Sequence, residues 1–522
     1  MSLRSVAVFF LLSPALCFGE KTVLILGGGL AGLQAAATLR SQNINFVLLE
    51  STNEVGGRVL TRSFQGRPIN VGPAVINPGA QWIHGISTEN PIWALASSDE
   101  CNVTSAFFGY DTIAFYDADG DGFKTDQETS YADVDAVFDA IDVIAENATK
   151  YAGMSLREAL NDEGSWTVNT SMKSAINWFA VDFEHAANAS QLAAGHIALP
   201  TYEVFGEDNH LITDSEGIQK IPKCIAKQAN LVEGTNLHLN ARVKTIDYGS
   251  TNNVTVTTSD GKSYSADYAI VTFSAGVLRH QGLDFVPPLP EDKQEAIEKF
   301  RMGLYETVYL KFRNNFWGET LKSVANSSQG VNNILVGTSN RSWVFYFYNL
   351  APFHDDWHTL AAVATGELAL KMERQSINKT RDEIMDLLRQ QYGNATEDPV
   401  DIYVPIWYHD DNFYGSYSYW PLGLTRSEFL DAKASISGKL YFAGEAFSED
   451  FPAFMHGAYL TGEEAANCVV KKIKPDFDFT CNITDKSSES PTPTPTGSAT
   501  LLNSSFTAMA VSIVSFLLLP WL

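Results

Sequence analysis

The sequence predicts an α/β fold with two domains, one built around a strand–glycine–helix unit and one of mixed α+β structure. Near the N-terminus a short apolar run, KTVLIL at 21–26, is followed by a glycine cluster, a helical segment and a second apolar run. Farther along, the helix-rich stretch Leu156–Ala194 and β-type runs such as Thr307–Phe312 alternate. Hydrophobic residues make up 45% of 522 residues, enough to bury large cores and to exclude a wholly disordered chain.

The chain is strongly acidic. Lys plus Arg number 36 against 61 for Asp plus Glu, which gives a formal net charge of −25. Such a surface repels nucleic acid and anionic lipid and attracts small cationic molecules. We therefore expect no nucleic-acid partner.

The N-terminus, residues 1–19, is predicted to be a secretory signal peptide. Arg4 supplies the positive start, Val6–Leu12 the apolar core, and Ala15, Cys17 and Gly19 the small residues for cleavage.

The C-terminus is predicted to carry a lipid-anchor signal. Residues 473–507 are assigned to a stalk rich in Ser, Thr and Pro, and residues 508–522 form an apolar tail. The small residues Gly497, Ser498 and Ala499, a polar spacer and the tail match a GPI attachment signal. A single-span anchor and a merely hydrophobic tail are the alternatives. The protein is thus expected to be secreted or on the cell surface, meeting the membrane only through a lipid anchor.

Glycosylation and disulfides fit that location. Five Cys are too few for a disulfide scaffold, but Cys101, Cys224, Cys468 and Cys481 could pair, the last two joining the stalk base to the preceding helix. Eleven N-x-S/T sequons predict a glycosylated surface. They begin at Asn102, Asn147, Asn169, Asn188, Asn253, Asn326, Asn340, Asn378, Asn394, Asn482 and Asn503.

The glycine cluster predicts a Rossmann-type dinucleotide site. Gly27, Gly29 and Gly32 fit G-x-G-x-x-G between a strand and a helix, and Glu50 ends the second strand. The first glycine makes the tight turn, the second lets the backbone approach a pyrophosphate, and the third lets helix and strand pack closely. An acid at the second strand end favours an unphosphorylated ribose, hence FAD or NAD.

The residues after Glu50 distinguish the two cofactors. Gly57 and Arg58 lie in NEVGGR at 53–58, which resembles the second FAD-binding signature of the flavin amine oxidase family. The resemblance implies that Glu50 holds the adenosine ribose and that Arg58 contacts the phosphate region.

Further segments resemble the same family in the same order. They are GAQWIHG at 79–85, ARVKTI at 241–246, GSYSYWPLG at 415–423 and the segment from Tyr441 to Ala465. The resemblance, closest to secreted FAD-dependent polyamine oxidases, implies cofactor contacts at Ala80, Val243, Glu445 and Met455. No Cys occurs in 441–457, so the FAD is expected to be noncovalent.

The motif positions predict a discontinuous cofactor domain. The FAD-binding domain is assigned to 20–105, 220–300 and 420–472, and the substrate-binding domain to 106–219 and 301–419.

Lys311 and His84 are the catalytic candidates. A lysine at the position of Lys311 resembles the family residue that binds a water at flavin N5, whereas the residue pattern alone equally allows a solvent-facing strand lysine. His84 matches a position in the substrate channel where some family members carry Glu, and a neutral His could accept a hydrogen bond from an ammonium group. A structural histidine is its alternative.

Three aromatic residues complete the predicted substrate site. Tyr417, Tyr419 and Phe454 lie in the segments that are nearest the flavin in the family, where they would exclude water and hold the amine. For at least one of the two tyrosines, core packing is the favoured interpretation.

An acidic loop suggests calcium. Asp117, Asp119, Asp121 and Glu128 fit the EF-hand loop pattern, although a strand rather than a helix precedes them. An acidic β-hairpin turn is the alternative. No other metal site is predicted.

The sequence thus predicts an FAD-dependent amine oxidase that turns a polyamine or related amine and O₂ into an aldehyde, a shorter amine and H₂O₂. A secreted L-amino acid oxidase would need an arginine for the substrate carboxylate, and none lies in 79–85. A non-catalytic surface protein of the same fold is the other alternative.

Overall fold

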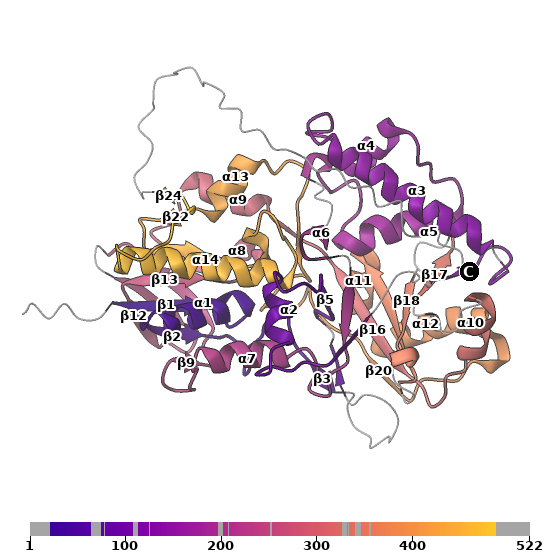
Figure 1. Cartoon of the computed structure of the whole chain (residues 1–522), viewed down its shortest axis with the longest axis horizontal. Helices are drawn as coiled ribbons and strands as arrows, with labels where there is room; N and C mark the ends of the chain where they lie inside the picture. The colour runs from indigo at the N-terminus through magenta and orange to yellow at the C-terminus, as the bar shows by residue number, and fades with distance from the viewer. Residues whose placement is uncertain are drawn as a thin grey trace, which may run out of the picture. The chain divides into compact units, whose positions relative to one another are not determined.

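A seven-stranded sheet forms the centre of the first half of the molecule, on the left in Figure 1. The computed structural model describes residues 21–63, 75–77, 79–107, 113–124, 126–196, 202–206, 208–250, 253–325, 331, 333–339, 346–353 and 357–486. The strand order is β24-β22-β23-β13-β1-β2-β9, and β1 pairs in parallel with both β2 and β13. The strands are β1 (Thr22–Leu26), β2 (Asn45–Leu49), β9 (Leu237–His238), β13 (Tyr268–Val271), β22 (Ser435–Ile436), β23 (Leu440–Phe442) and β24 (Asp485–Lys486).

This sheet is covered on both faces, which explains why its central strands are continuously apolar. Val23 and Ile25 of β1 pack on one face against four helices, and Leu24 and Leu26 pack on the other face. The helices of the first face are α1 (Leu30–Ser41), α2 (Pro91–Ala96), α7 (Lys220–Gln228) and α14 (Met455–Ile473). The other face packs on the sheet β12-β11-β10-β14 and three helices: β10 (Val243–Asp247), β11 (Val254–Thr258), β12 (Ser263–Ala266), β14 (Asp284–Val286), α8 (Ala275–Arg279), α9 (Glu291–Lys299) and α13 (Arg426–Lys433).

A six-stranded sheet organises the second half, on the right in Figure 1. Its order is β20-β16-β19-β18-β17-β7. The strands are β7 (Ile113–Asp117), β16 (Tyr305–Lys311), β17 (Asn333–Gly337), β18 (Tyr346–Asn349), β19 (Thr359–Thr365) and β20 (Asp401–Tyr403).

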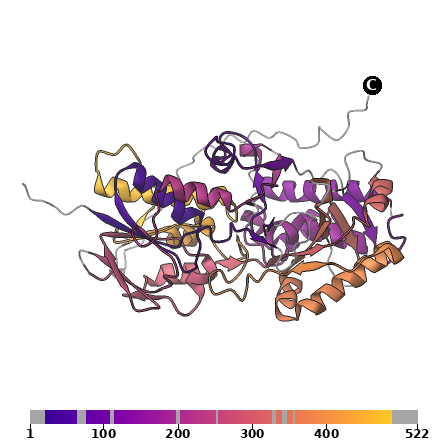
Figure 2. The same cartoon turned by 90° about the horizontal axis from the view of Figure 1, so that it is seen from below.

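Helices cover both faces of this second sheet too, as Figure 2 shows, with the purple helices on one side and the orange ones on the other. The first group comprises α3 (Gln127–Glu146), α4 (Leu156–Glu163) and α5 (Ser171–Trp178), which continues into a π-helical turn at Phe179–Phe183. The second comprises α10 (Gly318–Ala325), α11 (Gly366–Arg374) and α12 (Ile377–Tyr392).

Short strands connect the two halves. The sheet β5-β8-β6 and the pairs β15-β21 and β3-β4 consist of β3 (Arg62–Ser63), β4 (Val75–Ile76), β5 (Trp82–His84), β6 (Ser105–Phe107), β8 (Asn209–Ile212), β15 (Arg301–Met302) and β21 (Ser418–Tyr419). The remaining helical segments are α6 (Tyr202–Phe205) and 3₁₀ turns at Ala194–His196, Ala351–Phe353, Gly393–Ala395 and Glu445–Phe447. Within the described residues, no helix is both long and apolar enough to cross a membrane.

Two strands pair across the boundaries of the predicted segments, and the division into two domains stays a prediction. β8 comes from predicted substrate segment 106–219 yet pairs with β5 and β6. The first sheet also continues past the predicted boundary at Lys472, because β24 pairs with β22. The signal peptide at 1–19, the sequons at Asn326, Asn340 and Asn503, and the chain from Ser487 through the predicted tail lie outside the described residues.

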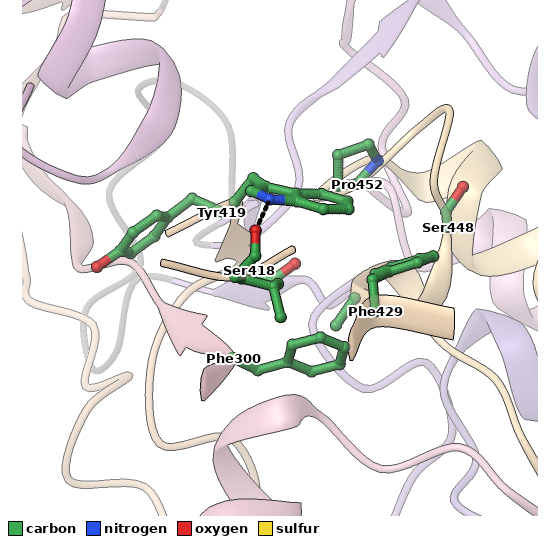
Figure 3. A pocket seen from close by; sticks show the side chains of 9 residues that line it. Phe300, Ser418, Tyr419, Phe429, Ser448 and Pro452 are labelled. Carbon is green, nitrogen blue, oxygen red and sulfur yellow. Dashed lines mark hydrogen bonds between the residues drawn. The ribbon is translucent and has the colours of Figure 1, made fainter. Parts of the chain in front are cut away.

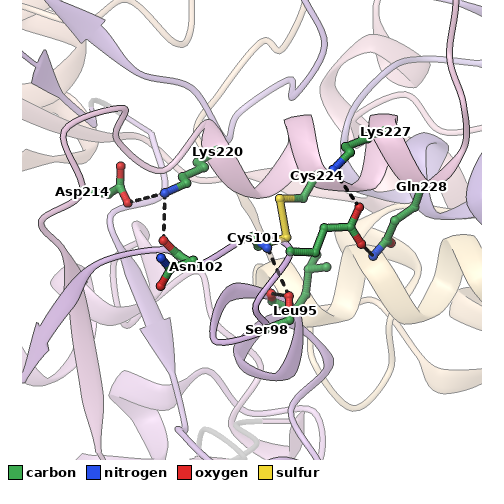
Figure 4. Close-up of a disulfide and its surroundings, with 10 residues drawn as sticks. Leu95, Ser98, Cys101, Asn102, Asp214, Lys220, Cys224, Lys227 and Gln228 are labelled. Carbon is green, nitrogen blue, oxygen red and sulfur yellow. Dashed lines mark hydrogen bonds and ion pairs between the residues drawn. A yellow bond between two sulfur atoms is a disulfide. The ribbon is translucent and has the colours of Figure 1, made fainter.

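The four cysteines whose pairing the sequence left open form two disulfides. Cys468 on α14 is joined to Cys481 and holds the segment that leads to β24. Cys101 is joined to Cys224 on α7, 123 residues away; Figure 4 shows this bond beside the ion pair between Lys220 and Asp214. Closing so long a loop restricts the unfolded chain, an effect of about 4–5 kcal/mol in the chain-entropy model.

Within the described residues, the acidic loop does not gather its carboxylates into a cation site. Asp117 accepts from the backbone N–H of Asp119 and pairs with Gly122 across a turn, while Asp119 accepts from the N–H of Ser339. Glu128 lies in the first turn of α3. In the described part of the chain, no cluster of three or more His, Cys, Asp and Glu could hold a metal ion. The calcium prediction is therefore not supported: the carboxylates serve the hairpin turn, which was the alternative.

A buried lysine of α9 caps the C-terminal end of α13. Lys293 of α9 is fully buried, and its Nζ donates to the carbonyl oxygens of Ala432 and Ala434 while lying 3.7 Å from the centre of the Phe442 ring. Burial lowers the pKa of Lys293 well below its usual value. The side chain thus satisfies carbonyls that the end of a helix leaves without partners.

We expect Lys293→Met to lower the free energy of unfolding by roughly 3 kcal/mol, because buried carbonyls lose their donor. Denaturant unfolding measures this change. Lys299→Met is the matched control on the same helix: Lys299 is partly exposed in its ion pair with Glu428, so its loss should cost less than about 1 kcal/mol. Equal effects of the two variants would contradict a capping role for Lys293.

Candidate active site

The glycine turn between β1 and α1 forms a cradle for a phosphate group. Gly27 has a φ of +115°, a conformation that L side chains rarely adopt. A Cβ at Gly32 would lie 1.9 Å from the carbonyl oxygen of Gly27, so a side chain would separate helix from strand. A Cβ at Gly29, the N-cap of α1, would meet nothing within 4 Å, which leaves space in front of the helix N-terminus. These features fit the pyrophosphate of a dinucleotide.

Glu50 is held at the edge of this cradle. It is buried, and its Oε2 accepts from the N–H of Gly28 at 2.7 Å. Its Oε1 accepts from the N–H of Thr52 at 2.8 Å and from the hydroxyl of Ser51 at 3.2 Å. The carboxylate therefore lies between the first glycine turn and the segment after β2, where a ribose hydroxyl would be expected.

A distant loop reaches the same place, which the sequence did not indicate. The side-chain oxygen of Asn412 accepts from the hydroxyl of Ser51 and from the guanidinium of Arg242, both at 2.7 Å. The N–H of Ala241 donates to the carbonyl of Glu50 at 2.7 Å, which brings Val243, the first residue of β10, close to the carboxylate. A cavity of about 170 Å³ lies beside this loop and beside Gly57.

Arg58 and Glu445 form the second part of the site. The Arg58 guanidinium lies 2.8 Å from Glu445 and donates to the carbonyl of Ser416 at 3.1 Å. Glu445 is buried and also accepts from the hydroxyl of Ser418 and from the N–H of Ala453. The two residues that were separately predicted to contact the cofactor thus lie together.

The other predicted cofactor residues lie around this ion pair. Ala80 donates its N–H to the carbonyl of Arg58 at 3.2 Å, and Gly57 lies against Gly29. Met455 is the first residue of α14, directly after the N-cap residue Phe454. Beside Ser418, an apolar pocket is lined by Phe300, Phe429 and their neighbours (Figure 3).

An aromatic wall lies next to the predicted flavin-facing strand. The ring of Phe454 lies edge-on to His84, with centroids 5.2 Å apart, and is stacked on His456 at 5.0 Å. Trp82 packs on Tyr348 at 4.8 Å. The structure therefore brings two of the predicted substrate residues together and adds His456, which the sequence analysis did not select.

The two tyrosines predicted for the substrate site, Tyr417 and Tyr419, have different surroundings. Tyr417 packs on Tyr305, and its hydroxyl donates to the carbonyl of Phe183 at 3.3 Å. Tyr419 pairs with Arg301 in a short strand, and in Figure 3 its hydroxyl points away from Phe300. Tyr417 thus borders the aromatic cluster through Tyr305, and Tyr419 packs against the core of the second half from its own strand.

Burial keeps the histidines of the wall neutral. It lowers the pKa of His84 to about 4 and that of His456 to about 3, so both are uncharged at neutral pH. Nδ1 of His84 lies 2.8 Å from the amide oxygen of Asn209. Because that oxygen only accepts, Nδ1 carries the proton and Nε2 the lone pair, a state that suits contact with a cationic amine.

Lys311 is buried at the last position of β16, which excludes the solvent-facing alternative. It pairs with Thr359 and Asp401 of the neighbouring strands, and burial lowers its pKa. Thr307 contacts the predicted flavin-facing strand segment: its hydroxyl accepts from the amide of Gln81 at 3.1 Å. Lys311 lies four residues farther, about 13 Å along the strand. Its catalytic role stays a prediction.

Comparisons with known proteins agree with this geometry. Residues 30–470 match the model of the family described as flavin containing amine oxidoreductase. The chain belongs to this family. It is 31% identical to Polyamine oxidase 6 of Oryza sativa subsp. japonica over 87% of this chain and 92% of the relative. It is 30% identical to Polyamine oxidase 1 of Zea mays, over 86% of this chain and 91% of the relative.

The solved structure of a putrescine oxidase shares the fold, with a TM-score of 0.69 and 21% identity over 86% of this chain and 99% of that chain. Family membership makes this protein an FAD-dependent amine oxidase, and the glycine cradle, Glu50 and Arg58 fit that cofactor. Bound FAD supplies the acceptor for two electrons from the amine. The glycine cradle, Glu50 and Arg58 would hold FAD, and the aromatic side chain beside the neutral His84 would exclude water from the predicted substrate space.

We expect Thr307→Val to lower kcat more than Lys311→Met. Loss of the Thr307 hydroxyl frees the amide of Gln81 next to the predicted flavin-facing strand, and a tenfold loss in kcat would correspond to about 1.4 kcal/mol. Lys311→Met removes a charge about 13 Å away along the strand and should change kcat by about twofold or less. Stopped-flow absorbance measures flavin reduction and reoxidation separately in both variants. The reverse order of effects would restore Lys311 as the lysine at the flavin.

Proposed function

We propose that this family member oxidises polyamines or closely related amines with O₂, giving an aldehyde, a shorter amine and H₂O₂. The likeness to two plant polyamine oxidases over more than nine-tenths of their length carries the substrate class. The neutral His84, the aromatic wall beside it and the net charge of −25 support a small cationic amine.

The oxidation of the amine conserves atoms and electrons. A neutral amine carbon next to nitrogen gives up two electrons and one proton equivalent as hydride, and the nitrogen loses a second proton, which leaves an imine. Water adds to the imine and releases the aldehyde and the shorter amine. O₂ takes the two electrons and two protons and becomes H₂O₂.

The experiment is a peroxide assay with the purified yellow protein on spermine, spermidine, N-acetylated polyamines and L-leucine. Peroxide with the polyamines but not with L-leucine supports the proposal. Activity on L-leucine alone would indicate the amino acid oxidase alternative, and no peroxide with any of them would favour the non-catalytic one.

We also propose that the protein is a glycosylated cell-surface protein. All eight sequon asparagines within the described residues are exposed: Asn102, Asn147, Asn169, Asn188, Asn253, Asn378, Asn394 and Asn482. Two disulfides suit an oxidising compartment.

A phosphatidylinositol-specific phospholipase should release the protein from intact cells, because the residues around Gly497 and the apolar tail match a GPI signal. The released fraction is measured by immunoblot. Release by detergent only would indicate a spanning anchor instead.

The FAD should be noncovalent, since 441–457 contains no cysteine to attach it. Acid precipitation of the purified holoenzyme is expected to leave all flavin absorbance in the supernatant. Yellow colour that stays with the precipitate would show a covalent bond.

We expect kcat/KM to rise between pH 6 and pH 9. Alkyl amines have pKa values of about 10, so the reactive neutral form increases with pH. His84 does not add to this rise, because its pKa of about 4 means that its proton has already left below pH 6. The pH profile of His84→Asn should therefore keep the same slope. A slope that disappears in this variant would show that His84 titrates near neutrality.

A further inference from the structure

Two carboxyl groups are buried together between β16 and α11. Glu306 is 1% exposed, and the side chain of Glu373 is also 1% exposed. A hydrogen bond joins the two carboxyls, so one of them keeps its proton. Burial, and then the contact with Glu373, raises the pKa of Glu306 well above its usual value. Burial alone would raise the pKa of Glu373 too, but the hydrogen bonds that it accepts from Glu306, Tyr408 and His409 hold it below its usual value. Because Glu373 accepts from the backbone N–H groups of three consecutive residues, it is the charged member of the pair, and Glu306 is the donor between them.

The carboxylate of Glu373 accepts hydrogen bonds from one short turn of the chain. Its Oε1 accepts from the N–H groups of Trp407 and Tyr408, both at 2.8 Å. Its Oε2 accepts from the N–H of His409 at 3.1 Å and lies 2.7 Å from Nδ1 of the same histidine. Four donors on three consecutive residues thus meet one carboxylate, which fixes the conformation of this turn. Charged acceptors make stronger hydrogen bonds than neutral ones.

The turn leads directly into the loop that reaches Glu50. Asp410 accepts from the N–H and the amide of Asn412, at 2.8 and 2.7 Å. Asn412 then meets Ser51 and Arg242, and Ser51 donates to Glu50. The next residue, Phe413, accepts from the hydroxyl of Ser274 at 2.8 Å. We call residues 407–413 the anchored loop.

We propose that Glu306 and Glu373 are positioning residues for FAD, since they fix the anchored loop that encloses the ribose end of the cofactor site. The pair contacts neither the predicted flavin-facing strand nor the glycine cradle in any hydrogen bond described above. Its influence passes through the loop to Asn412, Ser51 and Glu50. The pair therefore sets how long FAD stays bound, not how fast the amine is oxidised.

The experiment measures FAD release from the holoenzyme by the increase in flavin fluorescence after dilution, with no amine present. In Glu373→Gln one carboxylate oxygen becomes an NH₂ group that faces N–H donors, and release should be at least tenfold faster. Glu306→Leu removes the donor to Glu373 and should act in the same direction. Glu306→Gln can still donate to Glu373, so its release rate should stay within about threefold of the unmodified enzyme. At saturating FAD, kcat and KM for the amine should be unchanged in all three variants.

A matched control separates positioning from general stability. Thr425→Ala removes the capping box of α13, far along the chain from the pair, and should lower the free energy of unfolding by about 1 kcal/mol. It should not speed FAD release. If Glu373→Gln does not fold, His409→Ala replaces it: His409 is partly exposed, its loss removes one of the four donors, and release should be about threefold faster.

An unchanged rate of FAD release in both Glu373→Gln and Glu306→Leu would overturn the proposal. It would also be overturned if Thr425→Ala, at the same loss of unfolding free energy, released FAD as fast as Glu373→Gln. A fall in kcat at saturating FAD with normal release would also overturn it. Because the readout needs no substrate, its failure is separate from a failure of the polyamine assignment.

Discussion

The ion pair between Arg58 and Glu445 is the contact on which the rest of the site depends. It joins residues 387 positions apart, and Glu445 also binds Ser418 and Ala453. The N-terminal signature, the β21 segment and the turn before α14 therefore meet at one buried carboxylate. A buried ion pair is weak support for stability but strongly limits which arrangement of these segments is acceptable. The ion pair between Arg58 and Glu445 therefore aligns two distant parts of the chain around the predicted cofactor site.

Strand β16 connects that site to the second sheet. Successive side chains of a strand point to opposite faces, so the adjacent residues Glu306 and Thr307 contact different parts of the molecule. Thr307 meets Gln81 of the predicted flavin-facing strand, whereas Glu306 meets Glu373 on α11. One strand of the substrate half therefore contacts the flavin-facing segment directly and the ribose end through the anchored loop.

Burial sets the chemistry of the substrate space. The ring of Phe454, just before α14, packs edge-on against His84 of β5, and the loss of water favours the uncharged form of this histidine. The long-range attraction for cationic amines comes instead from the acidic surface, which is a property of composition. The acidic surface thus attracts the amine from a distance, whereas His84 and its aromatic neighbour would contact it in the site.

The sequence by itself determined the features that depend on neighbours along the chain. Gly27, Gly29, Gly32 and Glu50 act within one strand–helix–strand unit, so local spacing was enough to predict their arrangement. The Cys468–Cys481 bond spans only 13 positions, and the sequence offered it as one possible pairing. The order of the family motifs predicted the fold and the meeting of distant cofactor residues.

Only the tertiary structure decided the rest, because the contacts come from remote segments. Periodicity could not choose the side of Lys311, which the fold buries, and could not indicate that Thr307 of the same strand meets Gln81. The acidic pattern at 117–128 matched a calcium loop, but its oxygens are used by backbone N–H groups of a turn. Nothing near Glu373 in the sequence indicates Glu306 or His409, which are brought to it only by the packing of α11 on the second sheet.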